Sequence, residues 1–334
     1  MKKIGKQTIS LNNSPVITGW FSIVGPKEGE GPLNKYFDVV LEDSVFGEAS
    51  WEKAESKLIQ TSVEGAISKA GLSINDIDYI FAGDLLNQCT SSCFGLRALN
   101  ISFFGIYGAC STMAESMLLS SVFVDGEYGE NIVAATSSHF CSAERQFRFP
   151  LEYGGTRPET SQRTVTGSGA VVISKKGNGP KIKRVTPGKI VDLGIKDANN
   201  MGAAMAPAAA DTLIAFLDDT GEDINSYDMI LTGDLGKIGS DLLKEIILRN
   251  GYKTDKLYDC GLLIFDLESQ DAHSGGSGCG CSASVLSGYI MQNLISKRIR
   301  KMLFIATGAL MSPTTTQQGE NIPGIAHLIE ITCD

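Results

Sequence analysis

The chain repeats a short pattern in its two halves, and this repeat constrains the fold more than any other feature of the sequence. Residues 73–85 and residues 223–235 are identical at seven of thirteen positions, and both segments end in Gly-Asp-Leu. Cys110 and the serine after it recur 171 residues later at Cys281. A repeat of this length indicates two copies of one supersecondary unit.

Each copy shows the same order of local patterns. An apolar run before Gly-Asp predicts a buried strand, and the Cys-Ser pair lies at a turn into an apolar helix. A second apolar run ends in Thr136 and, at the same offset of 171 residues, in Thr307. Strands that alternate with helices indicate an α/β fold. We therefore expect an N-terminal half over residues 1–180 and a C-terminal half over residues 181–334, packed as one unit about a pseudo-twofold axis.

Periodicity predicts further elements. Residues 7–25 alternate polar and apolar side chains, which favours one or two strands. Residues 51–70 have apolar side chains at helical spacing, and Gly71 is a typical helix stop. Residues 166–174 predict a Gly-flanked strand that closes the first half, whereas residues 141–163 are expected to form an irregular excursion.

Cys110 is the most distinctive candidate functional residue. It lies between the apolar run 101–106 and a predicted helix over residues 113–124, and its neighbours are small. Free N–H groups and the dipole at a helix N-terminus favour an anion. A thiol in that position is expected to have a lowered pKa, about 3.5 to 7.5. Such a thiolate suits either a nucleophile or an anion-binding pocket.

Other candidates follow predicted strands and turns. Ligand sites in α/β sheets lie at the carboxyl ends of strands. If the halves pack about a twofold axis, Asp84 would face Asp234, and Cys110 would face Cys281. The candidate ligand-binding residues are Cys110, Ser111, Asp84, His139, Asp234 and Cys281.

Each of these residues also has a purely structural interpretation. Aspartates commonly cap helices or close turns, and a lone cysteine is often a small buried hydrophobe. His139 could be satisfied by the neighbouring backbone. Arg145, Arg148 and Arg163 could bind carboxylate groups through bidentate pairs, or lie at the surface or in a dimer interface.

Composition limits the class of partner. The net charge of −9 and the pI near 5.0 argue against nucleic acid, and the basic cluster at residues 297–301 is expected to be a solvated loop before a strand. No apolar run approaches the ~20 residues of a membrane span, and the N-terminus lacks the apolar core of a signal peptide. Eight unevenly spaced cysteines favour a reducing compartment over a disulfide framework. These features predict a protein on the cytosolic side of the membrane.

Neither a metal nor a cofactor is expected. The spacings at residues 89–93 and 279–281 do not match the Cys-x2-Cys of zinc knuckles. The Gly-rich runs at 167–169 and 274–280 lack the Lys-Ser or Lys-Thr of a phosphate loop.

In their order along the chain, these motifs resemble the thiolase and ketoacyl-synthase superfamily. They are the Ala-Cys-Ser turn at residues 109–111, the Thr-Gly-Ser-Gly-Ala-Val-Val strand from residue 166 and the Gly-rich turn before Ser282. The resemblance covers nearly the whole chain. It implies a duplicated, thiolase-like α/β fold of five layers, αβαβα, that normally forms a homodimer.

The resemblance also indicates where the catalytic residues of this superfamily would lie in the chain. Enzymes of this superfamily pair the cysteine with a His and with a second His, Asn or Cys, which activate the thiol and stabilise the oxyanion. The corresponding slots here are Gly-Asp-Leu-Gly at 233–236, Gly-Cys-Gly-Cys-Ser-Ala at 278–283 and Thr-Gly-Ala at 307–309, and the three histidines lie elsewhere. A former active site that serves as a binding pocket is therefore favoured. The alternative is an acyl-transfer or condensing enzyme that uses Cys110 on a coenzyme A or carrier-protein thioester.

Within the superfamily, several segments resemble a family of sporulation proteins: residues 82–88, 134–139, 143–148, 204–212 and 275–279. This resemblance implies non-catalytic binding of dipicolinic acid (pyridine-2,6-dicarboxylate), as the free acid or as its calcium chelate, during uptake into the developing spore. It also implies integral membrane proteins of the same machinery as partners. Because dipicolinate is a dianion, Asp84 would repel it unless the carboxyl points away, is protonated or contacts the calcium of the chelate.

Overall fold

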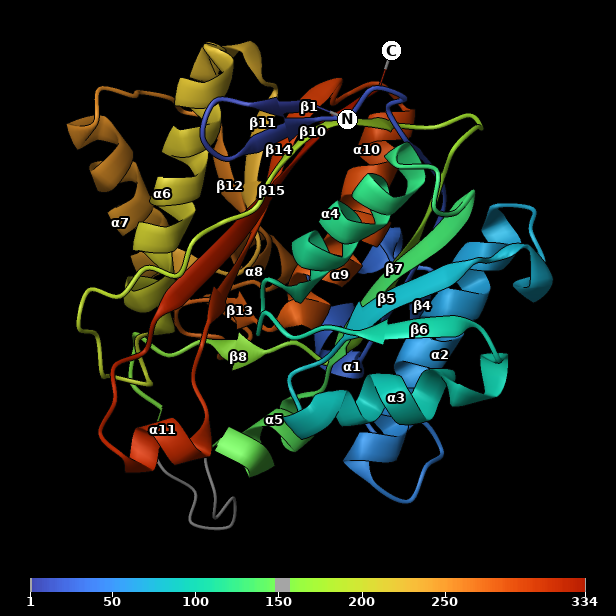
Figure 1. Cartoon of the computed structure of the whole chain (residues 1–334). Coiled ribbons are helices and arrows are strands. Elements are labelled where there is room, and N and C mark those ends of the chain that lie inside the picture. The colour runs from blue at the N-terminus through green and yellow to red at the C-terminus, as the bar shows by residue number, and fades with distance from the viewer. Residues whose placement is uncertain (1, 148–156, 334) are drawn as a thin grey trace.

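The first half of the chain builds one side of a large sheet (Figure 1). The computed structural model describes residues 2–147 and 157–333. The strands of this half are β3 (Val16–Val24), β5 (Tyr79–Gly83), β6 (Ser102–Gly105), β7 (Asn131–Ser138) and β9 (Gly167–Ser174). They lie in the order β3-β9-β7-β5-β6, with β9 antiparallel to both neighbours and β5, β6 and β7 parallel.

The second half repeats this topology. Its strands are β10 (Lys181–Thr186), β11 (Met229–Thr232), β12 (Leu257–Asp259), β14 (Lys301–Ala309) and β15 (Gly324–Thr332). They lie in the corresponding order β10-β15-β14-β11-β12, with the same parallel and antiparallel pairs. β10 joins the two half-sheets: Lys181 pairs antiparallel with Val16 of β3, and Arg184 and Val185 pair with residues 10 and 9 of the first half.

The strand pairing shows that the offset predicted for the last strands is wrong by one residue. β5 pairs its last residue, Gly83, with Thr136. The glycine at the equivalent place after β11 lies beside Ala306. Thr307 therefore corresponds to Ser137, one residue further along β7. Successive side chains of a strand point to opposite faces of the sheet. Thr136 and Thr307, which the repeat aligned, therefore lie on opposite faces of their strands.

Helices separate and cover the two half-sheets (Figure 1). α4 (Thr112–Asp125) and α9 (Cys279–Val285) lie between them, and α4 contacts β5 and β7 of the first half and β14 and β15 of the second. α2 (Trp51–Lys69) and α3 (Thr90–Leu96) pack on the outer side of the first half-sheet, whereas α6 (Met201–Thr220) and α7 (Gly236–Arg249) cover the second. The layers therefore follow the order helix, sheet, helix, sheet, helix.

Shorter elements complete the fold. The helices are α1 (Pro26–Gly29), α5 (Phe140–Phe147), α8 (Cys260–Ile264), α10 (Met291–Ile295) and α11 (Pro313–Gln317), with a π-helical turn at Leu286–Ile290 between α9 and α10. Single 3-10 turns occur at Asn34–Tyr36, Ile74–Asp76, Asn87–Cys89, Arg97–Leu99 and Ile224–Ser226. Minor strands are β1 (Lys2–Ile4), β2 (Thr8–Ser10) and β4 (Val39–Val40), and β8 (Arg163–Thr164) pairs with β13 (Gly276–Ser277) apart from the main sheet.

Of two segments predicted from local patterns, one is confirmed and the other is wrong at its start. The helix predicted over residues 51–70 is confirmed as α2, which begins where the Ser50 side chain accepts a hydrogen bond from the Lys53 N–H. The irregular excursion predicted over residues 141–163 is wrong at its start, because α5 occupies Phe140–Phe147 and buries Ala143 and Glu144. Residues 148–156 of that excursion lie outside the described residues.

The prediction that no apolar run approaches the length of a membrane span does not hold for one helix. α6 is long and apolar enough to cross a membrane by length and composition alone, and 61% of its most apolar window is buried inside the protein. Leu213 and Phe216 pack in the core of the second half, against residues of β14 and β15. The apolar composition of α6 is therefore explained by its place in the core.

Candidate functional site

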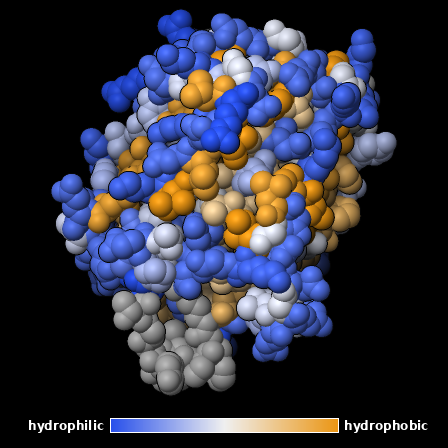
Figure 2. Space-filling view, turned by 90° about the vertical axis from the view of Figure 1, so that its left-hand side faces the viewer, coloured by the Kyte–Doolittle hydropathy of each residue, from blue (hydrophilic) through white to orange (hydrophobic). Residues whose placement is uncertain are grey.

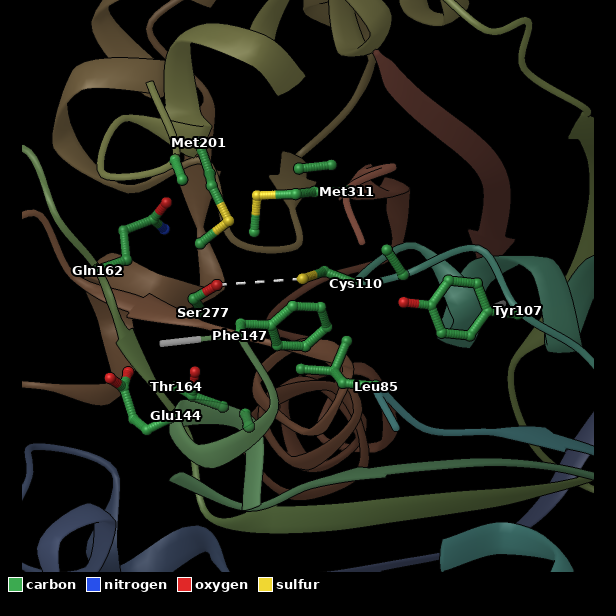
Figure 3. A pocket seen from close by; sticks show the side chains of 14 residues that line it. Leu85, Tyr107, Cys110, Glu144, Phe147, Gln162, Thr164, Met201, Ser277 and Met311 are labelled. Atoms are coloured by element: carbon green, nitrogen blue, oxygen red, sulfur yellow. Dashed lines mark hydrogen bonds between the residues drawn. The ribbon is translucent and has the colours of Figure 1, made fainter. Parts of the chain in front are cut away.

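A cavity lies where the carboxyl ends of strands from both halves meet (Figure 3). It contains about 630 Å³ of empty space, counted out to the open solvent. The Cys110 turn, α5, β8 and the ends of α6 and β14 supply the walls. The lining residues are Leu85, Tyr107, Ala109, Cys110, Ala143, Glu144, Phe147, Gln162, Thr164, Ala198, Met201, Ser277, Ala309 and Met311.

A tight turn holds Cys110 at this cavity. Ala109 has a φ of +52°, in the left-handed region that residues with a side chain seldom adopt. The Ser111 N–H donates to the Gly108 carbonyl oxygen at 3.1 Å, just before α4 begins. Gly308 of β14 packs so closely that a Cβ atom there would lie 2.2 Å from the Gly108 oxygen. The second half thus supports the turn that positions the sulfur.

A chain of polar groups leads inward from the sulfur. Cys110 Sγ lies 4.0 Å from Ser277 Oγ, the contact drawn in Figure 3. Ser277 Oγ donates to Asp234 Oδ2 at 3.1 Å, and the Gly278 N–H donates to the same oxygen at 2.9 Å. Thr307 Oγ1 donates to Asp234 Oδ1 at 2.9 Å. Asp234 therefore joins β13, the start of α9 and β14 directly behind Cys110.

The prediction of a lowered pKa for Cys110 is wrong. Burial and the neighbouring Asp234 carboxyl raise the pKa of the Cys110 thiol well above its ordinary value. The side chain is only 6% exposed, so desolvation and a nearby negative charge outweigh the favourable helix N-terminus. Burial also raises the pKa of Asp234. Cys110 is therefore a protonated thiol at neutral pH.

The walls of the cavity are mostly apolar. Leu85, Phe147, Met201 and Met311 surround its centre from different elements (Figure 3). Thioether side chains are flexible and make favourable contacts with aromatic rings. The arrangement suits a small, flat, partly apolar ligand.

Polar groups interrupt these walls at a few places. Gln162 donates from Nε2 to the Asp234 and Gly276 carbonyl oxygens at 2.6 and 2.9 Å, and its Oε1 atom is buried without a hydrogen-bond partner. The Tyr107 hydroxyl points toward the cavity (Figure 3). Burial raises the pKa of Tyr107, so that the hydroxyl remains a neutral donor. An unsatisfied acceptor and a neutral donor are thus available at the cavity wall.

No cationic side chain lines the described part of the cavity wall. Glu144 lies on one wall. Asp234 lies just behind Ser277. Two like charges 4 Å apart at an effective dielectric constant of 20 repel by about 4 kcal/mol. The bare dianion of a dicarboxylic acid would therefore be disfavoured here.

Asp84 does not line the cavity. It is fully buried, its Oδ1 atom accepts from the Leu86 N–H at 2.9 Å, and its Oδ2 atom accepts from Ser92 N–H and Oγ at 2.7 Å each. These bonds shape the turn that places Leu85 on the cavity wall. Burial raises the pKa of Asp84. The structural interpretation, an aspartate that closes a turn, describes these contacts.

Cys281 and Ser111 also point elsewhere. Cys281 is fully buried in the core, with Sγ 3.8 Å from the Gly233 carbonyl oxygen. It is the third residue of α9, whereas Cys110 precedes the first residue of α4, so the two sulfurs sit about one helical turn apart in their local frames. Ser111 Oγ donates to the Gly108 carbonyl oxygen at 2.7 Å. Only Cys110 among the candidate residues lines the cavity.

The histidines have structural partners. His139 is 1% exposed, its Nε2 atom lies 2.7 Å from the Ser44 carbonyl oxygen, and its Nδ1 atom accepts from the Cys141 N–H. Burial lowers the pKa of His139, which favours the neutral ring. His273 contacts Asp271, and His327 accepts a backbone hydrogen bond from Gly188. Over residues 2–147 and 157–333 no three Cys, His, Asp or Glu side chains are grouped to hold a metal ion.

Two of the arginines considered for dicarboxylate recognition, Arg145 and Arg163, lie outside the cavity. Arg145 forms an ion pair with Glu52 and stacks over the Trp51 ring. The Arg163 guanidinium stacks 3.8 Å from the centre of the Phe140 ring. Arg148 lies outside the described residues.

Sequence reasoning missed most of the cavity wall. Ser277 lies in a Gly-rich turn that was assessed only as a weak phosphate loop, although its position before the second Cys-Ser motif was a usable signal. Glu144 lies in the segment expected to be irregular. Met201 and Met311 come from the start of α6 and the region after β14, and no local pattern relates them.

Solved structures share this fold over nearly the whole chain. The chain is similar to 3-oxoacyl-[acyl-carrier-protein] synthase III from Aquifex aeolicus VF5, with a TM-score of 0.58 and 11% identity over 95% of this chain and 99% of that one. It is similar to cerulenin-bound OleA from Xanthomonas campestris, with a TM-score of 0.61 and 12% identity over 97% of this chain and 98% of that one. The thiolase-like α/β fold is thus confirmed, and at these identities the likeness shows the fold alone.

Sequence comparison is more specific. The family model described as Stage V sporulation protein AD (SpoVAD) matches residues 5–332. Stage V sporulation protein AD from Bacillus subtilis (strain 168) is 45% identical over 328 residues, which cover 98% of this chain and 97% of that relative. The chain therefore has a thiolase-like α/β fold and belongs to the stage V sporulation protein AD family.

Proposed function

We propose that this protein binds dipicolinic acid in the Cys110 cavity without transforming it, as a component of the machinery that moves the acid into the developing spore. Membership of a sporulation family supports the biological context. The apolar walls around Leu85, Phe147 and Met311 would contact the pyridine ring. The polar groups at the wall would meet the ring substituents.

The environment of Cys110 is the observation that carries this proposal. Cys110 Sγ lies 4.0 Å from Ser277 Oγ, and Ser277 donates to the Asp234 carboxyl behind it. Acyl transfer needs a thiolate, which an adjacent base or a lowered pKa normally supplies. Here burial and Asp234 raise the pKa of the thiol instead. The cavity therefore favours binding over nucleophilic attack.

The negative surroundings favour the calcium chelate, or the protonated acid, as the bound form. Glu144 and the Oε1 atom of Gln162 present carboxylate and amide oxygens at the wall. Oxygen atoms of these types are the ligands that Ca²⁺ prefers. The chelate would bring its own cation to a wall that would repel the free dianion.

Calorimetric titration with dipicolinate, with and without CaCl2, tests the proposal. Ala198→Trp would narrow the half-buried rim of the cavity and should weaken binding at least tenfold. Ala203→Trp, on α6 but outside the cavity wall, is the matched control and should retain wild-type affinity. Equal affinity of the wild type and Ala198→Trp would exclude this cavity as the binding site.

Acyl transfer is the second candidate function, because Cys110 lies at a turn with a left-handed φ and faces a ligand-sized cavity. Incubation with acyl-coenzyme A followed by intact-mass measurement distinguishes the two functions. No mass shift is expected. An acyl adduct that disappears in Cys110→Ala would favour the enzyme.

We also propose that the protein associates peripherally with a membrane, beside integral membrane partners. The basic cluster at residues 297–301 ends at the first residue of β14, so it lies at the amino end of that strand, opposite the carboxyl end that meets the cavity. Lys297, Arg298 and Arg300 are exposed there. Sedimentation with anionic vesicles should weaken in the double variant Arg298→Glu/Arg300→Glu, by about 1 kcal/mol per charge, and remain unchanged in Lys244→Glu on α7.

The sheet edge supports a homodimer. Within the described residues β6 pairs only with β5, and Phe104 on β6 is 41% exposed. An unpaired edge strand can pair with its copy across a twofold axis. Light scattering should report a dimer that Phe104→Lys converts to monomer, whereas Phe94→Lys on α3 should remain dimeric.

A further inference from the structure

Another hollow lies at the end of the molecule where β14 begins and β15 ends, away from the Cys110 cavity (Figure 1). It contains about 710 Å³ of empty space, counted out to the open solvent. Figure 2 shows that hydrophilic side chains predominate along the upper edge of the molecule, the end at which β14 begins. The described lining residues include three cations and no carboxylate, on a chain whose net charge is −9. They are Lys297, Arg300, Lys301, Thr332 and Cys333.

The turn after α10 brings Lys297 to this hollow. The Lys297 N–H donates to the Leu294 carbonyl oxygen, and the Arg298 N–H donates to the Asn293 carbonyl oxygen, both at 3.0 Å. Lys297 itself has a φ of +58°. Helices that end in this left-handed conformation most often place glycine there. The lysine thus puts a charge at the hollow from a backbone position that favours glycine.

The start of β14 supplies the other two cations. The N–H groups of Arg300 and Lys301 both donate to Asp228 Oδ2, at 2.8 and 3.0 Å. The Cys333 N–H donates to the Arg300 carbonyl oxygen at 2.8 Å. The backbone of this segment is therefore held on both sides, and its side chains line the hollow.

The glutamates near the hollow are already paired. Lys301 Nζ lies 2.8 Å from Glu222 Oε2 and 4.0 Å from Glu330 Oε1. Arg184 forms ion pairs with the same two glutamates. Two carboxylates thus face two cations, and this network contributes no net charge to the hollow.

Lys297 and Arg300 have no such partners. Within residues 2–147 and 157–333, neither side chain forms an ion pair. Both are exposed, so an anion from the solvent can reach them. Arg298 is exposed as well but does not line the hollow. The hollow therefore presents two accessible cations without a counter-charge.

We infer that this hollow binds a phosphate group between Lys297 and Arg300. The guanidinium of Arg300 presents a planar fork of donors to two phosphate oxygens, and the ammonium of Lys297 acts as a compact charge. Because the two cations come from different segments, the tetrahedral oxygens of a phosphate match them better than the two coplanar oxygens of a carboxylate. The phosphate belongs either to a soluble ester or to a lipid headgroup, and the second source rests on the proposed membrane association.

Calorimetry with glycerol 3-phosphate at constant ionic strength tests the soluble source. Lys297→Gln and, separately, Arg300→Gln should weaken binding at least fivefold, because each removes one of the two cations. Arg298→Gln is the matched control, since it removes an exposed cation of the same segment that does not line the hollow, and it should bind within twofold of the wild type. Thermal melts that match the wild type would show that each variant is folded.

Sedimentation with vesicles tests the lipid source against surface charge alone. Phosphatidylglycerol vesicles are compared with oleate vesicles of equal surface potential. Loss of one charge near an anionic surface weakens binding by about fivefold, the equivalent of about 1 kcal/mol, and Arg298→Gln should show this effect on both kinds of vesicle. Arg300→Gln should weaken binding to phosphatidylglycerol at least fivefold further, and oleate vesicles should not show this additional loss.

The outcomes separate this inference from the proposed membrane association. Glycerol 3-phosphate binding that depends on Lys297 and Arg300, without vesicle binding, would support the phosphate site and contradict the membrane association. Equal losses in Arg298→Gln and Arg300→Gln on both kinds of vesicle, without glycerol 3-phosphate binding, would overturn the phosphate site and support the membrane association. Absence of binding to either probe, or unchanged binding of both probes in Lys297→Gln and Arg300→Gln, would also overturn the inference.

Discussion

The two Gly-Asp-Leu turns have the same sequence, but their aspartates accept hydrogen bonds from different parts of the chain. Asp84 accepts hydrogen bonds from Leu86 and Ser92, within the next eight residues. The donors to Asp234 come from elements 43 to 73 residues away: Ser277, Gly278 and Thr307. One aspartate closes its own turn, and the other assembles the surroundings of Cys110.

A third aspartate explains this difference. Asp259, at the end of β12, accepts hydrogen bonds from the Leu235 and Gly236 N–H groups at 2.8 and 3.1 Å. The equivalent strand of the first half ends at Gly105, which has no side chain to do so. Because Asp259 holds the second turn, Asp234 is available for distant donors. Two copies of one motif can therefore have different roles when a residue of a neighbouring strand accepts the hydrogen bonds that hold one of the turns.

The ends of β7 and β14 provide the first comparison, because equivalent residues there have different surroundings. Gly308→Val would drive a side chain into the Gly108 carbonyl oxygen and should cost about 4 kcal/mol of the free energy of unfolding. Ser138 holds the corresponding place in the first half and donates to the Val165 carbonyl oxygen, so Ser138→Ala should cost only about 1 kcal/mol. Urea unfolding measures both. Equal costs would show that β14 does not constrain the Cys110 turn.

The outer helices provide the second comparison. Glu55 of α2 is buried at the place that Met205 occupies in α6, and burial followed by the charge of Asp84 raises the pKa of Glu55 to about 8. Between the ordinary pKa of 4.5 and about 8 the unfolded carboxyl is ionised while the folded one is protonated, so unfolding releases a proton. Stability should therefore fall as pH rises through this window.

Glu55→Gln should flatten the dependence of stability on pH, because the amide keeps an oxygen acceptor for Ser137 and Ser142 but does not titrate. Chemical unfolding from pH 5 to pH 8.5 is the measurement. Glu64→Gln, exposed on the same helix, is the control and should leave the slope unchanged. A slope unaffected by Glu55→Gln would contradict the assignment.

Thiol reactivity sharpens the contrast between the two aspartates. Asp234→Asn removes a charge that, together with burial, raises the pKa of Cys110, so alkylation of Cys110 by iodoacetamide at pH 8 should be several-fold faster. Asp84→Asn should leave the Cys110 rate unchanged. Peptide mass spectrometry follows the modification. A similar acceleration in both variants would mean that the two turns affect the sulfur equally.

The smallest expected effect distinguishes the two cysteines. Cys281→Ala should cost about 1 kcal/mol, because it leaves a small void in a fully buried core. Cys110→Ala should cost less than about 0.5 kcal/mol, since its sulfur borders an existing cavity. Parallel urea titrations compare them, and a larger cost at Cys110 would reverse the assignment of structural and cavity roles.

Several features of the fold were predictable from local patterns. The helix over residues 51–70 and the strand over 166–174 follow from periodicity and from glycine positions, and both are present as α2 and β9. The turn at Cys110 follows from a run of small residues between two apolar segments. The offset of the repeat was wrong by one residue, because sequence identity alone does not specify strand register.

By itself the sequence determined the α/β class, the duplication and the place of Cys110 between a strand and a helix, because these depend on residues close together in the chain. Only the tertiary structure decided that Asp234 turns toward Cys110, that Asp84 turns away and that Cys281 is buried in the core. Hydrogen-bond partners and desolvation depend on groups far apart in the chain. For that reason the thiol that local sequence predicts to be acidic is held protonated by an aspartate more than a hundred residues away.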